Sequence, residues 1–109
     1  MAEGREVCGS NLLTLAQSER LAYLLEELGE AQQCIGKILR HGYDSSSPGV
    51  MTTNNRRDLE RELSDVQCAI DLLLDNDDLS VSHMIEFKRQ KKGRSKYFHY
   101  EHKGVNETI

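Results

Sequence analysis

The sequence predicts an all-α fold, an antiparallel bundle of three to four helices. Apolar residues recur at helical spacing in two long stretches, from about 11 to 41 and from about 55 to 74. Only 6% of the residues are aromatic, and Pro48 is the one proline. This composition favours helices packed through Leu, Ile, Val and Ala over a β-sandwich. The 109 residues suit one compact domain, which we expect to span 1–109.

The first helix and the loop after it follow from local signals. A polar arm, 1–10, should precede the helix, and Thr14 or Ser18 could cap it. Residues 42–54 combine glycines, three serines, a proline and asparagine, which predicts a loop. That loop is long for a connection between two helices, and long loops in compact domains are often functional.

The later helices have weaker boundaries. Asn55 can cap a second helix, where Asp58 favours the exposed amides of the first turn, and the run DNDD at 75–78 should end it. A third helix should start after Ser80. A short fourth helix could follow over 95–103, and the tail at 103–109 should fray.

Charge is distributed unevenly along the chain. Residues 88–103 carry seven Lys or Arg and one Glu, a charge of +6, so the rest carries −10 against a net charge of −4. An acidic body with a basic segment suggests that the two parts meet or that an anion lies between them. No apolar run is long enough to cross a membrane, and 1–10 has no signal-peptide character. The three cysteines match no zinc pattern, so we expect reduced thiols in a cytoplasmic protein, with Cys34 and Cys68 as packing residues of the helices.

Two pairs of carboxylates lie on consecutive predicted helices. Glu27 and Glu30 are three residues apart, and Glu62 and Asp65 repeat that step on the second helix. This spacing places each pair on one helix face, beside the apolar stripe that should be buried. If the two stripes pack together, all four carboxylates converge and raise one another's pKa. Mg²⁺ or Mn²⁺, which prefers oxygen ligands, would remove that repulsion.

The stretches EELGE at 26–30 and ELSDV at 62–66 resemble the motifs of the MazG-like, all-α nucleoside triphosphate pyrophosphohydrolases. The resemblance covers about residues 18–98, although the 31 residues between Glu30 and Glu62 exceed the spacing in many relatives. It implies that Glu27, Glu30, Glu62 and Asp65 bind Mg²⁺ or Mn²⁺. It also implies that Glu26 is a further ligand or the base that orients water.

The resemblance implies a metal-dependent hydrolysis of a (deoxy)nucleoside triphosphate to the monophosphate and pyrophosphate, in bacterial or phage nucleotide-pool control. A guanine nucleotide, dGTP or GTP, is the first guess for the substrate. Basic residues of the C-terminal segment would contact the phosphates: Lys92 and Lys96 first, then Lys88, Lys91, Arg94 and Tyr97. Asn11, His41 and Tyr43, at expected helix ends, are candidates for the nucleoside pocket. Because relatives complete the cleft by oligomerisation and two helices bury little alone, we expect a homodimer or homotetramer.

Two other interpretations stay open. One is a sibling enzyme of the same superfamily, a dUTP/dCTP diphosphatase or a phosphoribosyl-ATP pyrophosphohydrolase, with a similar metal site. The other is a non-enzymatic adaptor or nucleic-acid-binding protein that uses the basic and aromatic residues of 88–100. The charge of −10 on the rest of the chain argues against nucleic acid as a partner, because it would repel a polyanion.

Overall fold

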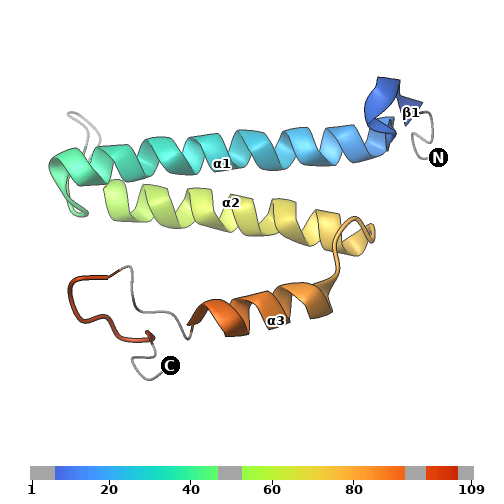
Figure 1. Cartoon of the computed structure of the whole chain (residues 1–109). Coiled ribbons are helices and arrows are strands. Elements are labelled where there is room, and N and C mark those ends of the chain that lie inside the picture. The colour runs from blue at the N-terminus through green and yellow to red at the C-terminus, as the bar shows by residue number, and fades with distance from the viewer. Residues whose placement is uncertain (1–6, 47–52, 93–97, 106–109) are drawn as a thin grey trace. The chain divides into compact units, whose positions relative to one another are not determined.

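The structure, a computed structural model, describes residues 7–46, 53–92 and 98–105. Three α-helices dominate these residues: α1 (Leu15–His41), α2 (Asn55–Asp75) and α3 (Val81–Lys92) (Figure 1). The chain forms two compact units, 1–78 and 79–109. The all-α prediction is therefore confirmed, while the expectation of one domain over 1–109 stays a prediction.

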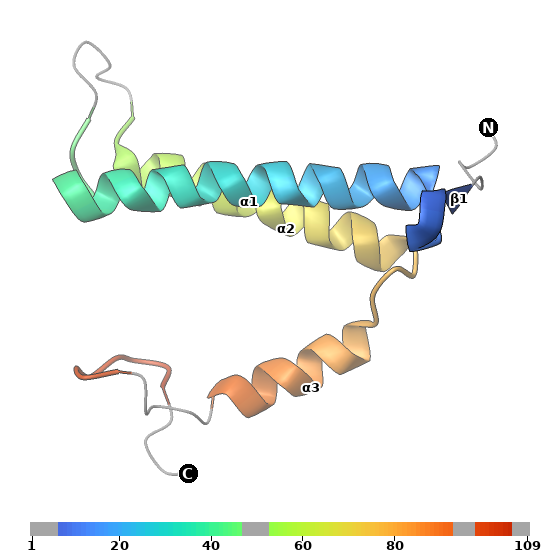
Figure 2. The same cartoon turned by 45° about the horizontal axis from the view of Figure 1, so that its top comes forward.

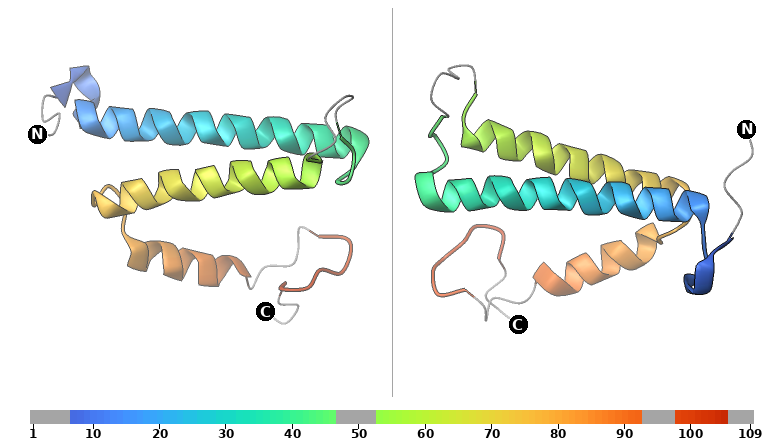
Figure 3. Two further views of the ribbon diagram at one scale, coloured as in Figure 1. Left: turned by 180° about the vertical axis from the view of Figure 1, so that it is seen from behind. Right: turned by 90° about the horizontal axis from the view of Figure 1, so that it is seen from above.

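In the first unit, α1 and α2 lie side by side and run in opposite directions, as the front and rear views show (Figures 1 and 3). Their contact is made by small or branched apolar residues, and the buried ones are Ala31, Val66, Ala69 and Leu73. Alanines at a helix contact let two backbones approach closely. The resulting core is narrow, and most leucines of α1 stay partly exposed.

The start of α1 is fixed by a capping box. The Thr14 hydroxyl accepts a hydrogen bond from the Gln17 amide at 3.0 Å, and the Gln17 side chain accepts from the Thr14 amide at 2.8 Å. Before it, β1 (Val7–Cys8) pairs antiparallel with β2 (Leu13–Thr14) around a 3₁₀ turn, η1 (Gly9–Asn11). The described part of the expected arm is thus a small hairpin, and the helix starts after it because the pairing uses Leu13 and Thr14.

The loop has the predicted bounds, 42–54, because α1 ends at His41 and α2 begins at Asn55. Figure 2 shows its described ends, 42–46 and 53–54, at one end of the helical hairpin. Asn54, not Asn55, caps α2: its side chain accepts from the Arg57 amide at 2.9 Å. Asn55 is instead buried, and its side-chain amide donates to the Gly42 carbonyl at 3.1 Å. This bond joins the two ends of the loop. The prediction that Asn55 caps α2 was therefore wrong by one residue.

The second unit contains α3, which is exposed along its whole length. The sequence suggested a short fourth helix over 95–103, but its described part, 98–103, contains no helix. An isolated helix of that length is marginal, and Tyr, Phe and His are weak helix formers. Residues 102–105 form a turn instead, closed by the Val105 amide on the His102 carbonyl at 3.3 Å.

Candidate metal centre

Three carboxylates from two helices meet near the middle of the helical hairpin. Glu27 and Glu30 come from α1 and Glu62 from α2, and one oxygen of each lies within 4.8 Å of the other two. Glu27 precedes the buried Ala31 by one helical turn, and Glu62 precedes the buried Val66 in the same way. The packing that buries these two apolar residues therefore brings the carboxylates together.

Two oxygens of this cluster are buried without a hydrogen-bond partner: Oε2 of Glu27 and Oε2 of Glu62. Burial is the largest cause that raises the pKa of Glu27, followed by the charges of Glu30, Asp65 and Glu26. For Glu62, a hydrogen bond with Glu30 is the largest cause that raises the pKa, followed by burial and the neighbouring charges. The fold thus disfavours three simultaneous negative charges at this place.

A carboxylate cluster of this kind has two ways to relieve the repulsion. A proton can be shared between two carboxyl groups, or a cation can bind the oxygens. The donor set is made only of carboxylate oxygens, which suits Mg²⁺ or Mn²⁺ and not a soft metal. The buried oxygens that lack partners are the atoms that a cation would satisfy. The residues present therefore fit a hard divalent cation.

The fourth expected ligand, Asp65, lies near the cluster but outside the group of three. Its charge raises the pKa of both Glu27 and Glu62, so it belongs to the same electrostatic environment. Glu26 is exposed on α1, and its charge also raises the pKa of Glu27. The structure therefore joins three of the expected acidic residues directly and places Asp65 and Glu26 around them.

Tyr23 is a residue near this cluster that the sequence analysis missed. Burial raises the pKa of its hydroxyl, and the charges of Glu27, Cys68, Asp65 and Glu26 add to that effect. Tyr23 lies one helical turn before Glu27 on α1. That four-residue spacing was visible in the sequence and could have identified it.

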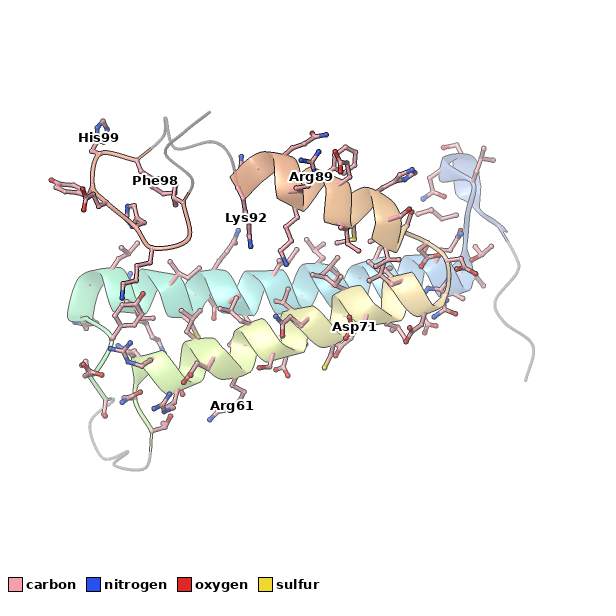
Figure 4. All side chains as sticks on the ribbon, turned by 90° about the horizontal axis from the view of Figure 1, so that it is seen from below. Arg61, Asp71, Arg89, Lys92, Phe98 and His99 are labelled. Carbon is pink, nitrogen blue, oxygen red and sulfur yellow. The ribbon has the colours of Figure 1, made fainter. Side chains whose placement is uncertain are left out.

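The basic candidates belong to the second unit. Lys88, Lys91 and Lys92 lie on α3, where Figure 4 shows Arg89 and Lys92 on the last turns. Basic residues at a helix C-terminus interact favourably with the carbonyls there. Arg94, Lys96 and Tyr97 lie outside the described residues.

The nucleoside candidates are separated by the length of α1. Asn11 precedes the helix, and its side chain accepts a hydrogen bond from the Leu13 amide at 3.0 Å. His41 ends the helix, 27 residues or about 40 Å long, and Tyr43 follows it. The Tyr43 ring stacks under the Arg56 guanidinium at 4.4 Å, which supports the loop. Asn11 cannot share one pocket with the other two in a single chain.

An ion pair connects α1 to the residues that follow α2, at the end of the hairpin opposite the loop. No sequence pattern predicted it. Arg20 on α1 donates from Nε to Asp78 at 2.6 Å and from Nη2 at 3.1 Å. The Arg20 guanidinium holds the pKa of Asp78 below its usual range. Both side chains are only 12% exposed, so water screens this pair weakly. It fixes the position of α2 along the axis of α1 and so helps to keep Glu62 close to Glu27.

The two described cysteines on the helices differ in environment. Cys34 is half-buried in the hairpin, and burial, with the charges of Glu62 and Asp58, raises the pKa of its thiol. It is a packing residue, as the sequence predicted. Cys68 is exposed on α2, because its place on the helix turns it away from the buried stripe. The packing role expected for Cys68 was therefore wrong.

Comparisons of this chain with models of protein families, with curated proteins and with solved structures give no match. Over its described residues, the chain has no helix that combines the length and the apolar character needed to span a bilayer. Function is therefore inferred from the carboxylates themselves.

Proposed function

We propose that this chain is a divalent-cation-dependent nucleoside triphosphate pyrophosphohydrolase. The observation that carries the proposal is the group of three carboxylates from α1 and α2, two of which have a buried oxygen without a partner. The resemblance of EELGE and ELSDV to the MazG-like motifs supports the same conclusion from the sequence. The product pair would be a nucleoside monophosphate and pyrophosphate.

The chain's residues would divide the work between binding and proton transfer. Glu27, Glu30 and Glu62 would hold Mg²⁺ or Mn²⁺, with Asp65 completing the acidic site. The cation would supply charge neutralisation for the triphosphate oxygens. Glu26, exposed next to Glu27, would orient the attacking water and accept its proton. No protein nucleophile is required for this reaction.

The proposal extends to assembly and substrate binding. The hairpin of α1 and α2 would be part of an antiparallel bundle completed by α3 and by oligomerisation, in a cytoplasmic enzyme of nucleotide metabolism. The basic residues of α3, with Lys92 foremost, would bind the phosphate tail by charge-assisted hydrogen bonds. The guanine preference remains the first choice for the base.

The experiment is a substrate panel with purified full-length chain, Mg²⁺ or Mn²⁺, and chromatographic detection of nucleotide products. The panel holds the common ribo- and deoxynucleoside triphosphates, including dGTP, dUTP and dCTP, and phosphoribosyl-ATP. We expect monophosphate and pyrophosphate from at least one of them. Turnover of dUTP, dCTP or phosphoribosyl-ATP alone would identify a sibling activity.

Matched substitutions assign the activity to the cluster. Glu30→Ala and Asp65→Ala should lose activity, whereas Glu60→Ala should keep it, because Glu60 is exposed on α2 and pairs with Arg57. The proposal is refuted if no nucleotide is hydrolysed, or if Glu30→Ala and Asp65→Ala both keep full activity. Salt-sensitive retention on DNA or RNA without turnover would favour the nucleic-acid-binding alternative.

A further inference from the structure

A line of polar residues follows α1 along one edge of its contact with α2. Its members are separated alternately by four and three residues: Tyr23, Glu27, Glu30, Cys34, Lys37 and His41. This spacing keeps side chains on one face of a helix. Glu27, Glu30 and Cys34 are half-buried, whereas Lys37 and His41, which lie toward the loop, are exposed. The polar line therefore leads from the carboxylate cluster to a lysine.

Two cations from different helices lie near Cys34, one helical turn beyond Glu30. Burial is the largest cause that raises the pKa of the Cys34 thiol, and the charges of Lys37 and Arg61 lower it. Arg61 directly precedes Glu62 on α2. Lys37 follows Glu30 by seven residues, about 10 Å along the helix axis. Because side chains of a helix tilt toward its N-terminus, Lys37 tilts back toward the carboxylates.

Lys37 differs from most basic residues of the first unit because its charge is not paired. Within the described part of that unit, ion pairs with aspartate or glutamate hold the arginines Arg20, Arg56, Arg57 and Arg61. The Lys37 ammonium makes no ion pair or hydrogen bond with any residue that the structure describes. The Arg61 pair is weak, since its length is 3.4 Å and the Arg61 side chain is 62% exposed. Both cations can therefore turn to an anion at the cluster.

The charges on the two sides of the cluster are opposite in sign. Glu19 and Glu26 lie between the cluster and the N-terminus of α1, and Lys37 lies between the cluster and the loop. Three carboxylates exceed the charge of one divalent cation, so the loaded cluster would still repel phosphate oxygens that the cation does not bind. A polyphosphate held there is repelled on the side of Glu26 and attracted on the side of Lys37. This asymmetry orients it.

We propose that Lys37, assisted by Arg61, binds the β- and γ-phosphates of the substrate, the part that leaves as pyrophosphate. This inference rests on the proposed function. Water bonds to the α-phosphorus while Glu26 accepts its proton, and the bond from the α-phosphorus to the bridging oxygen breaks. The electron pair of that bond stays on pyrophosphate, whose growing negative charge the Lys37 ammonium stabilises. Glu26 and Lys37 lie on opposite sides of the cluster, which suits an in-line displacement.

Calorimetric titration of the full-length chain with inorganic pyrophosphate and Mg²⁺ tests the assignment without turnover. Lys37→Ala should weaken pyrophosphate binding roughly tenfold or more, because a hydrogen bond to a charged group is lost, and Lys37→Arg should keep most of the affinity. Binding of dGMP with Mg²⁺ should stay unchanged in Lys37→Ala, since a monophosphate has only the α-phosphate. Arg57→Ala is the matched control, because Arg57 is an exposed cation of α2 that pairs with Glu60.

The inference is overturned if wild type does not bind pyrophosphate, or if Lys37→Ala or Arg57→Ala binds it as Lys37 and Arg57 are predicted not to allow: no loss in the first, or an equal loss in the second. An equal loss of dGMP affinity in Lys37→Ala also overturns it, because Lys37 would then contact the nucleotide end. The hydrolase proposal fails separately, if no triphosphate is hydrolysed while pyrophosphate binding still depends on Lys37. Circular dichroism checks that each variant is helical, as expected since Lys37 is exposed and alanine favours helix.

Discussion

Glu62→Gln separates the electrostatic cost of the carboxylate cluster from its ability to bind a cation. The substitution keeps the shape of the side chain and removes its charge, and the new amide can donate a hydrogen bond to the Glu30 carboxylate, which has an oxygen within 4.8 Å. Since the pKa of Glu62 is raised, its charged form is disfavoured by the fold. Without a metal, the variant should therefore melt at a higher temperature than wild type at pH 7.5.

Adding Mg²⁺ or Mn²⁺ should reverse that order. A cation at 100 times its dissociation constant stabilises the folded protein by about 2.7 kcal/mol. For a unit of this size that corresponds to a rise in melting temperature of roughly 10–20 °C. Glu62→Gln removes one of three carboxylate ligands. Because loss of even an outer-shell partner weakens binding by about 10–100-fold, we expect at least ~100-fold here, which leaves about 0.4 kcal/mol at the same concentration.

The assay is thermal unfolding of both proteins with and without each cation, followed by circular dichroism. Glu60→Gln is the matched control, because Glu60 is an exposed carboxylate of the same helix and should leave the full shift in place. If wild type gains nothing from either cation, or if the two variants respond alike, the three carboxylates do not form a cation site.

Three further predictions concern pH, the core and the basic segment. The metal-free protein should lose stability as pH rises above the usual glutamate pKa of 4.5 and through the raised pKa values of Glu27 and Glu62. The reason is that the fold favours the protonated forms of these two side chains. Melting temperatures measured across this pH range test the prediction, and a melting temperature that does not change with pH would contradict it. Asp78 does not mask this change, since its lowered pKa places its own effect below pH 3.8. Leu73→Ala should cost roughly 3–5 kcal/mol in urea unfolding, because Leu73 is 1% exposed, and the 39% exposed Leu72 should lose less on the same change. Lys92→Ala should raise KM or lower kcat for a nucleoside triphosphate; unchanged kinetics would make 88–103 a solvated tail.

Local features of the helices were predictable from the sequence. Periodicity of apolar residues gave α1 and α2, and the glycine- and serine-rich stretch gave the loop with its correct bounds. Thr14 as a cap was one of two predicted choices, and the structure selects it because Gln17 completes the box. The spacing of acidic residues along each helix also predicted that Glu27, Glu30 and Glu62 lie close together, because carboxylates beside a buried apolar stripe lie near the partner helix.

Contacts between distant residues were not predictable in this way. Arg20 and Asp78 are 58 residues apart, and their pairing depends on how far α2 slides along α1. Asp65 lies beside the group of three and not within it. Asn55 does not cap α2, because its side chain donates across the loop to the Gly42 carbonyl instead. Periodicity specifies which face is apolar, but not which part of that face a second helix covers.

Hydrolysis in ¹⁸O-labelled water tests the central claim most directly. The chain is incubated with dGTP or the best substrate of the panel and Mg²⁺, and the products are analysed by mass spectrometry. Water attack at the α-phosphorus predicts one ¹⁸O in the nucleoside monophosphate and none in pyrophosphate, with no reaction in Glu30→Ala. Label in pyrophosphate or orthophosphate, or equal turnover in that variant, would contradict a pyrophosphohydrolase built on Glu27, Glu30 and Glu62.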